Sequence, residues 1–150
     1  MTNLYILLML MAGVAVALQI VVNAQLRVVS ASALWATNIS FAVSMAAGLV
    51  ALATGAALGR VPLPDPALWR APAWVWLGGL GGAAYVLLAV LLAHRLGAAL
   101  LSAVGIVGQL VAAVLIDHYG WFGTPVHRVS AARAAGVVLL TVGVALIRWK

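Results

Sequence analysis

The few charged residues of this chain leave long stretches with no charge between them. No charged residue precedes Arg27, and further uncharged stretches cover 28–59, 71–94, 96–116 and 134–147. Of the 150 residues, 67% are hydrophobic and 7% are charged, whereas a soluble domain carries about 25% charged residues. So few charges cannot cover the surface of a soluble globule, and the chain is too hydrophobic to be disordered. The pattern predicts a protein whose main solvent is lipid.

The uncharged stretches have the length of membrane-spanning helices. A helix needs about 20 mostly apolar residues to cross the hydrocarbon core of a bilayer. The stretches lack the two-residue alternation of a membrane β-barrel. We therefore predict an all-α membrane protein, a single domain over residues 1–150. Its five spans are expected at 3–25, 31–54, 74–94, 98–116 and 130–149.

Prolines, tryptophans and the first residues agree with this map. All five prolines fall between predicted spans, where no helical hydrogen bond is lost. Most tryptophans lie near span ends, as in the aromatic belts of membrane proteins. The segment 55–73 is too apolar for a soluble loop, so we expect it along the interface, with a short helix near 66–70. The start lacks the basic residues of a signal peptide, and we expect it to be retained as the first helix.

The basic residues divide evenly between the two predicted sides of the membrane. The side of the N-terminus holds Arg60, Arg70, Arg128 and Arg133, and the other side holds Arg27, Arg95, Arg148 and Lys150. Orientation normally follows an excess of Lys and Arg on the cytoplasmic side, and here there is none. An even split can arise by chance. The hypothesis that we favour is dual topology, in which the chain inserts both ways and opposite copies pair into a two-repeat transporter.

Neutral polar side chains are the main chemical feature inside the predicted spans. Charged groups are absent from the span centres, which disfavours a proton-exchanging carboxylate for lipophilic cations. An unpartnered amide in hydrocarbon costs several kcal/mol, so these side chains should face the bundle interior. They either bridge helices or line a cavity for a neutral, zwitterionic or anionic solute. The cavity candidates are Gln19, Asn23, Asn38, Tyr85, Ser102 and Gln109.

Glycines inside the spans form a second pattern. Gly78 and Gly82 have the small-xxx-small spacing of helix contacts in membranes. Gly136 and Gly143 lie seven apart and give the fifth span a smooth stripe, which we expect to contact a second copy. Such glycines serve either close packing or sliding between helices. The packing candidates are Gly78, Gly82, Gly105, Gly108, Gly136 and Gly143.

Catalytic chemistry is difficult to build from this composition. The only acids are Asp65 and Asp117, and cysteine is absent, so we expect no catalytic residue and no cofactor. Asp117, His118 and His127 are too poorly arranged to favour a metal site, because adjacent side chains point apart. The basic residues are scattered rather than clustered, which argues against nucleic acid as a partner.

Several motifs then occur in order along nearly the whole chain, and together they resemble a known family. They are Gln19, Asn23-Ala-Gln-Leu26, Trp74-Val-Trp-Leu-Gly-Gly-Leu-Gly-Gly-Ala-Ala-Tyr85, His94-Arg-Leu-Gly-Ala98, Gly108-Gln109, Ile116-Asp-His-Tyr-Gly-Trp121, Arg133-Ala-Ala-Gly136 and Gly143. This order resembles the YdcZ-like, five-helix branch of the drug/metabolite transporter superfamily. His94 departs from the resemblance, since a less basic residue is expected there.

The resemblance implies a half-size transporter of the bacterial inner membrane. It implies an antiparallel dimer with the cavity between two bundles, so the expected partners are a second copy, membrane lipids and a small solute. Asp117 and His118 match a recurring element that either caps the fourth span or, with Arg95 of an opposite copy, forms a gate. The leading prediction is a secondary transporter or facilitator of a small organic solute. The alternative is an accessory subunit that pairs with another membrane protein.

Overall fold

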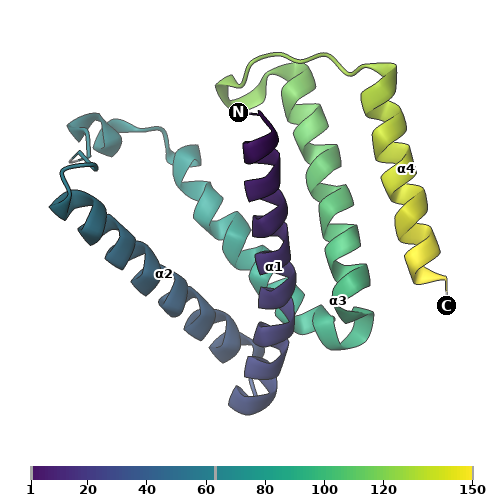
Figure 1. Ribbon diagram of the computed structural model, residues 1–150, viewed down its shortest axis with the longest axis horizontal. Helices are drawn as coiled ribbons and strands as arrows, with labels where there is room; N and C mark the ends of the chain where they lie inside the picture. Colours follow the sequence, from purple (N-terminus) through teal and green to yellow (C-terminus); the bar gives the residue numbers. More distant parts are fainter. Residues whose placement is uncertain (1, 63, 150) are drawn as a thin grey trace. The chain divides into compact units, whose positions relative to one another are not determined.

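The computed structural model describes residues 2–62 and 64–149 and is built from helices. Its elements, in chain order, are α1 (Thr2–Ser30), α2 (Ala33–Ala57), η1 (Pro66–Arg70), η2 (Ala73–Trp76), α3 (Leu77–Tyr119), η3 (Trp121–Gly123) and α4 (Ala131–Arg148), of which η1 to η3 are 3-10 helices (Figure 1). No strand occurs within these two ranges, and all four α-helices are long and apolar enough to cross a membrane. The prediction of an all-α protein with membrane-spanning helices is confirmed.

The third and fourth predicted spans both lie in α3, which is interrupted at Gly97. The helix has 43 residues and would be about 65 Å long if straight, roughly twice the hydrocarbon thickness of a bilayer. Gly97 has φ 76° and ψ 158°, outside the helical region, so two helical segments, 77–96 and 98–119, meet there. This backbone conformation is essentially restricted to glycine. Four α-helices do not confirm five spans, although the break falls in the predicted connection between 94 and 98.

The other helix boundaries follow from capping residues. Ser32 accepts a hydrogen bond from the Trp35 N–H (3.4 Å) at the start of α2. Ser130 accepts one from the Arg133 N–H (3.3 Å) at the start of α4. Both are side chains that N-caps prefer. The short helix predicted near 66–70 is confirmed as η1. Leu63 of the predicted interfacial loop, Lys150 of the charge balance and Met1 lie outside the described residues.

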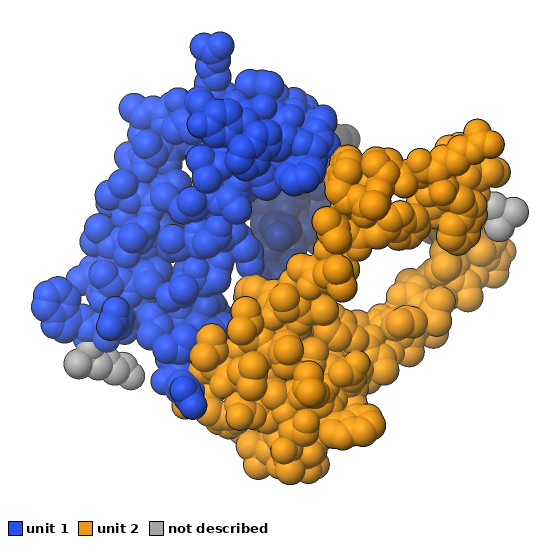
Figure 2. Space-filling model, turned by 180° about the vertical axis from the view of Figure 1, so that it is seen from behind, with its two compact units in different colours: residues 1–17, 95–150 blue, residues 18–94 orange. Residues whose placement is uncertain are grey.

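The helices group into two compact units, coloured separately in Figure 2. Unit 1 comprises residues 1–17 and 95–150, and unit 2 comprises residues 18–94. In unit 2 the buried core is formed mainly by small residues, which allow membrane helices to approach closely. The buried apolar side chains of unit 2 are Ile20, Ala24, Ala36, Ala89, Val90 and Ala93.

Arg27 joins α1 to α3 within unit 2. Its guanidinium nitrogen Nη1 donates to the carbonyls of Val90 (3.1 Å) and Leu91 (3.0 Å), and His94 Nε2 lies 3.2 Å from the Ala24 carbonyl oxygen. The carbonyls of Val90 and Leu91 lie within the last two turns of the segment that precedes the break at Gly97. A cation at the carbonyl end of a helix is favourable because the helix dipole is negative there. Arg27 therefore has a structural role in addition to its place in the charge balance.

Candidate functional site

Two of the predicted cavity residues lie on the packed side of α1. Asn23 is buried, with 5% of its surface exposed, and Gln19, one turn earlier, is half-buried. They share a stripe with Ile20, Ala24 and Arg27, as the four-residue spacing predicts. Among the described residues, the Asn23 side chain forms no hydrogen bond. No completely buried side-chain N or O in that part of the chain lacks a partner, so the Asn23 amide still reaches a surface.

The other two candidates in unit 2 differ in exposure. Asn38 is exposed, and its amide nitrogen donates to the Leu34 carbonyl of its own helix (2.9 Å). That hydrogen bond lowers the cost of placing the amide near lipid. Tyr85 is half-buried in the 77–96 segment. The expectation of inward-facing polar groups thus fits Asn23 best within this unit and does not fit Asn38.

Ser102 and Gln109 share one face of the 98–119 segment in unit 1. Ser102 is half-buried, Gly105 lies between them on that face, and Gln109 is exposed. At 3.6 residues per turn, Gln109 lies about 180° around the helix from Leu100 and about 100° from Leu110, and it lines neither of the grooves against α4 to which these leucines contribute. Within the described ranges the Gln109 amide has no hydrogen-bond partner. An exposed, unpartnered amide in an apolar span needs to be covered by something other than lipid.

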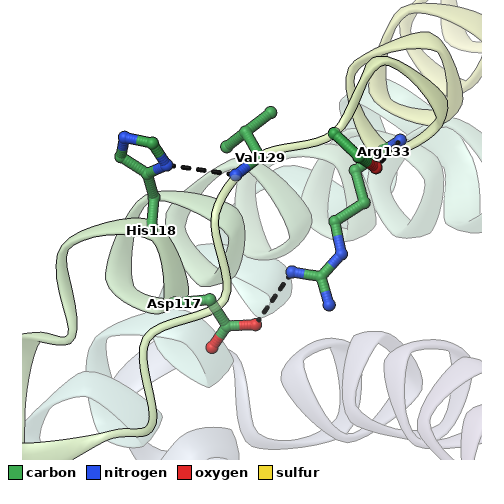
Figure 3. Close-up of polar contacts among 5 residues, drawn as sticks. Asp117, His118, Val129 and Arg133 are labelled. Atoms are coloured by element: carbon green, nitrogen blue, oxygen red, sulfur yellow. Dashed lines mark hydrogen bonds and ion pairs between the residues drawn. The ribbon is translucent and has the colours of Figure 1, made fainter.

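Asp117 and His118 connect the end of α3 to the start of α4 (Figure 3). Asp117 Oδ2 lies 3.5 Å from Arg133 Nη1, and His118 Nδ1 accepts a hydrogen bond from the Val129 N–H (3.1 Å). The Asp117 carbonyl also accepts from the His127 N–H (2.8 Å). With roughly 40% of each side chain exposed, the ion pair contributes on the order of 0.5 kcal/mol. This arrangement favours the helix-end role of the two residues.

Arg95, the other gate candidate, shares no hydrogen bond or ion pair with Asp117 or His118. It is exposed and forms no ion pair with any residue that the structure describes. Asp117 already has Arg133 as an intrachain partner, so a gate between copies would have to compete with that contact. The gate with Arg95 of an opposite copy stays a prediction.

Five of the six glycine candidates are not needed for close packing inside one chain. A Cβ built on Gly78, Gly82 or Gly108 would meet no atom within 4 Å, and the same holds for Gly136 and Gly143. Gly136 lines a groove beside Arg133 and faces α3 of its own chain. The expected contact of the stripe of Gly136 and Gly143 with a second copy stays a prediction. Gly105 is half-buried.

Two grooves, which the sequence did not indicate, lie between α4 and residues 96–117 of α3. These helices run side by side in Figure 1. The first groove has a volume of about 750 Å³ and is lined by Leu96, Leu100, Val104, Thr141, Val144, Ala145, Arg148 and Trp149. The second has about 390 Å³ and is lined by Leu110, Ala113, Val114, Asp117, Arg133, Gly136 and Leu140. Nowhere in the described ranges do three His, Cys, Asp or Glu side chains gather to hold a metal.

The chain matches a known protein family. A family model described as "Putative inner membrane exporter, YdcZ" matches residues 4–146. No curated protein and no solved structure matches the chain. The matched range contains every candidate from Gln19 to Gly143, whereas Arg148 and Trp149 of the first groove lie beyond it.

Proposed function

The chain belongs to the YdcZ family of inner membrane exporters, and from this premise we propose that it exports a small organic solute as an antiparallel, dual-topology homodimer. It is a multi-pass protein of the inner membrane. The cavity is formed between the two copies, and the transport is secondary, driven by gradients rather than by a bound cofactor. The chain itself catalyses no reaction.

The proposed topology has five crossings. The 43 residues of α3 are too many for one crossing, since the hydrocarbon core is about 30 Å thick. The segments 77–96 and 98–119 on either side of Gly97 are each about 30 Å long and can cross separately. With α1, α2 and α4, this makes five crossings, so the termini lie on opposite sides of the membrane. One copy then supplies half of a two-repeat transporter.

The exposed amide of Gln109 is the observation that carries the dimer proposal. It lies near the centre of an apolar segment without a hydrogen-bond partner in the described chain. A second copy covering this face would remove the amide from lipid and place Ser102 and Gln109 beside a shared space. The balanced charges of the chain allow that copy to be inverted. Amides without a neighbouring acid suit a neutral, zwitterionic or anionic solute.

Topology is the first test of the proposal. We expect a tag at the C-terminus to be found on both sides of the membrane in comparable amounts, and a tag at the N-terminus likewise. The physical reason is the four-to-four split of Lys and Arg, which gives no orientation preference. Site-specific labelling of intact cells measures the two populations. A single orientation in every molecule would contradict the homodimer.

Transport is the second test, with Gln109→Leu as the informative variant. In liposomes loaded with neutral, zwitterionic and anionic solutes, we expect this change to reduce flux about tenfold, because one solute hydrogen bond of about 1.4 kcal/mol is lost. The matched control is Val111→Leu, which adds bulk to another face of the same segment and should leave flux unchanged. Equal flux in both variants removes Gln109 from the cavity. No flux of any solute from well-folded protein favours the accessory-subunit alternative.

A further inference from the structure

The first groove between α3 and α4 is an apolar trough with its charge at one end. Its walls are Leu96, Leu100 and Val104 from α3, facing Val144 and Ala145 from α4. All of these residues belong to unit 1. The volume of about 750 Å³ falls in the range of about 300–1,000 Å³ that small-molecule pockets occupy. The groove can therefore hold a ligand with a long apolar part.

The charged group of this groove lies at one end. The hydroxyl of Thr141 donates to the Val137 carbonyl of its own helix (2.8 Å) and is thus occupied. Arg148 contributes a guanidinium that forms no ion pair or hydrogen bond with the described residues. No Asp or Glu is among the described residues that line the groove. A ligand that matches this lining has one anionic group, placed at the Arg148 end.

The depth of the Arg148 end in the membrane indicates which class of anionic ligand fits the groove. Arg148 closes α4, and Trp149 follows it with 85% of its surface exposed. Trp and Arg at a helix end are the anchors of the membrane–water interface. From Arg148 back to Thr141 the groove extends along α4 for about 10 Å toward the membrane centre. It therefore runs parallel to the helices, from headgroup depth into the hydrocarbon.

We propose that this groove binds an anionic phospholipid, with an acyl chain along Leu100 and Val144 and the headgroup phosphate at Arg148. A phospholipid in the leaflet already has this orientation, with its charge at the interface and its chain directed inward. Basic pockets between membrane helices bind anionic headgroups, and guanidinium pairs well with phosphate. The transported solute is instead expected near the midplane. The lipid site does not depend on the proposed export.

Lipid binding to the purified full-length protein in detergent tests the proposal. Native mass spectrometry would count bound phosphatidylglycerol and phosphatidylcholine with identical chains, with glycerol phosphate as a headgroup without chains. We expect phosphatidylglycerol to bind more tightly, and Arg148→Gln to weaken it about tenfold while leaving phosphatidylcholine unchanged, since one charge-assisted contact is lost. Glycerol phosphate should bind far more weakly, because it lacks the chain.

The second arm of the experiment fills the groove with a larger side chain. Val144→Trp places a large side chain in the groove and should prevent binding of both lipids. Leu139→Trp is the matched control, because Leu139 is 71% exposed on α4 and does not line the groove. The proposal is overturned if Arg148→Gln leaves phosphatidylglycerol binding intact, or if glycerol phosphate binds as tightly as the lipid. It is also overturned if Val144→Trp dissociates a dimer without changing lipid binding, which would assign the groove to a second copy.

Discussion

Replacing Gly97 with alanine is expected to destabilise the protein by about 2 kcal/mol. The backbone at Gly97 has φ 76° and ψ 158°, a region in which a side chain costs on the order of 1–3 kcal/mol. A Cβ at this position would meet no atom within 4 Å, so the cost arises from the backbone and not from a steric clash. Alanine also favours the helical conformation, which would join the two segments of α3 into one helix that is too long for the bilayer.

The matched control for this prediction is Gly108→Ala in the same element. Gly108 is helical, and its Cβ would also meet nothing within 4 Å. Here alanine should be neutral or stabilise the protein by up to about 1 kcal/mol, because glycine is the poorer helix former. Reversible unfolding in mixed micelles measures both variants. If the two variants unfold alike, the break at Gly97 is not a glycine-dependent feature.

The second large effect is expected for Arg27→Met. This change keeps the apolar stem but removes the hydrogen bonds from Nη1 to the carbonyls of Val90 and Leu91. Hydrogen bonds from a charged donor contribute about 1.5–3 kcal/mol in buried settings. One of these two is part-buried and the other exposed, so we expect a total loss of about 2 kcal/mol. The same unfolding measurement reports it.

Arg60→Met is the control that distinguishes the effect of losing the hydrogen bonds of Arg27 from the effect of losing one positive charge. Arg60 is exposed, and its side chain forms no hydrogen bond or ion pair with the described residues, so its loss should change stability by about 0.5 kcal/mol or less. Each variant leaves four basic residues against three, but on opposite sides of the membrane. Arg27→Met and Arg60→Met should therefore shift the orientation of tagged protein in opposite directions. Only Arg27→Met should lower the free energy of unfolding substantially. Equal stability in both variants would contradict a stabilising role for the hydrogen bonds from Arg27 to Val90 and Leu91.

The helical regions were predictable because charge and hydropathy act locally. The 66–70 helix and the connection near Gly97 also follow from local signals, namely Asp65 before Pro66 and the short charged interval around Arg95. The contacts of Arg27 were not predictable, since Val90 and Leu91 lie 63 and 64 residues further along the chain. No local pattern relates positions that far apart. The two grooves depend on packing between helices and were missed for the same reason.

The amides show a different limit of sequence reasoning. The four-residue spacing correctly places Gln19 and Asn23 on one stripe, and the seven-residue spacing places Ser102 and Gln109 on another. In a helix that is apolar all round, the sequence does not indicate which stripe turns inward. Asn23 is buried, whereas Gln109 and Asn38 lie on the surface of the single chain. Whether a surface amide faces lipid or another copy depends on assembly, which one chain does not encode locally.

The single-residue junction at Gly97 also bears on synthesis at the ribosome. In the proposed topology, the segments 77–96 and 98–119 reach the translocon with no hydrophilic loop between them. His94 and Arg95 are then the main polar groups that the insertion machinery has to retain or carry across. A connection with one arginine adds little to the Lys and Arg bias that sets orientation, so the two segments can enter in either direction with similar ease. A glycine that terminates a helix would thereby keep both insertion routes open while the chain is still being made.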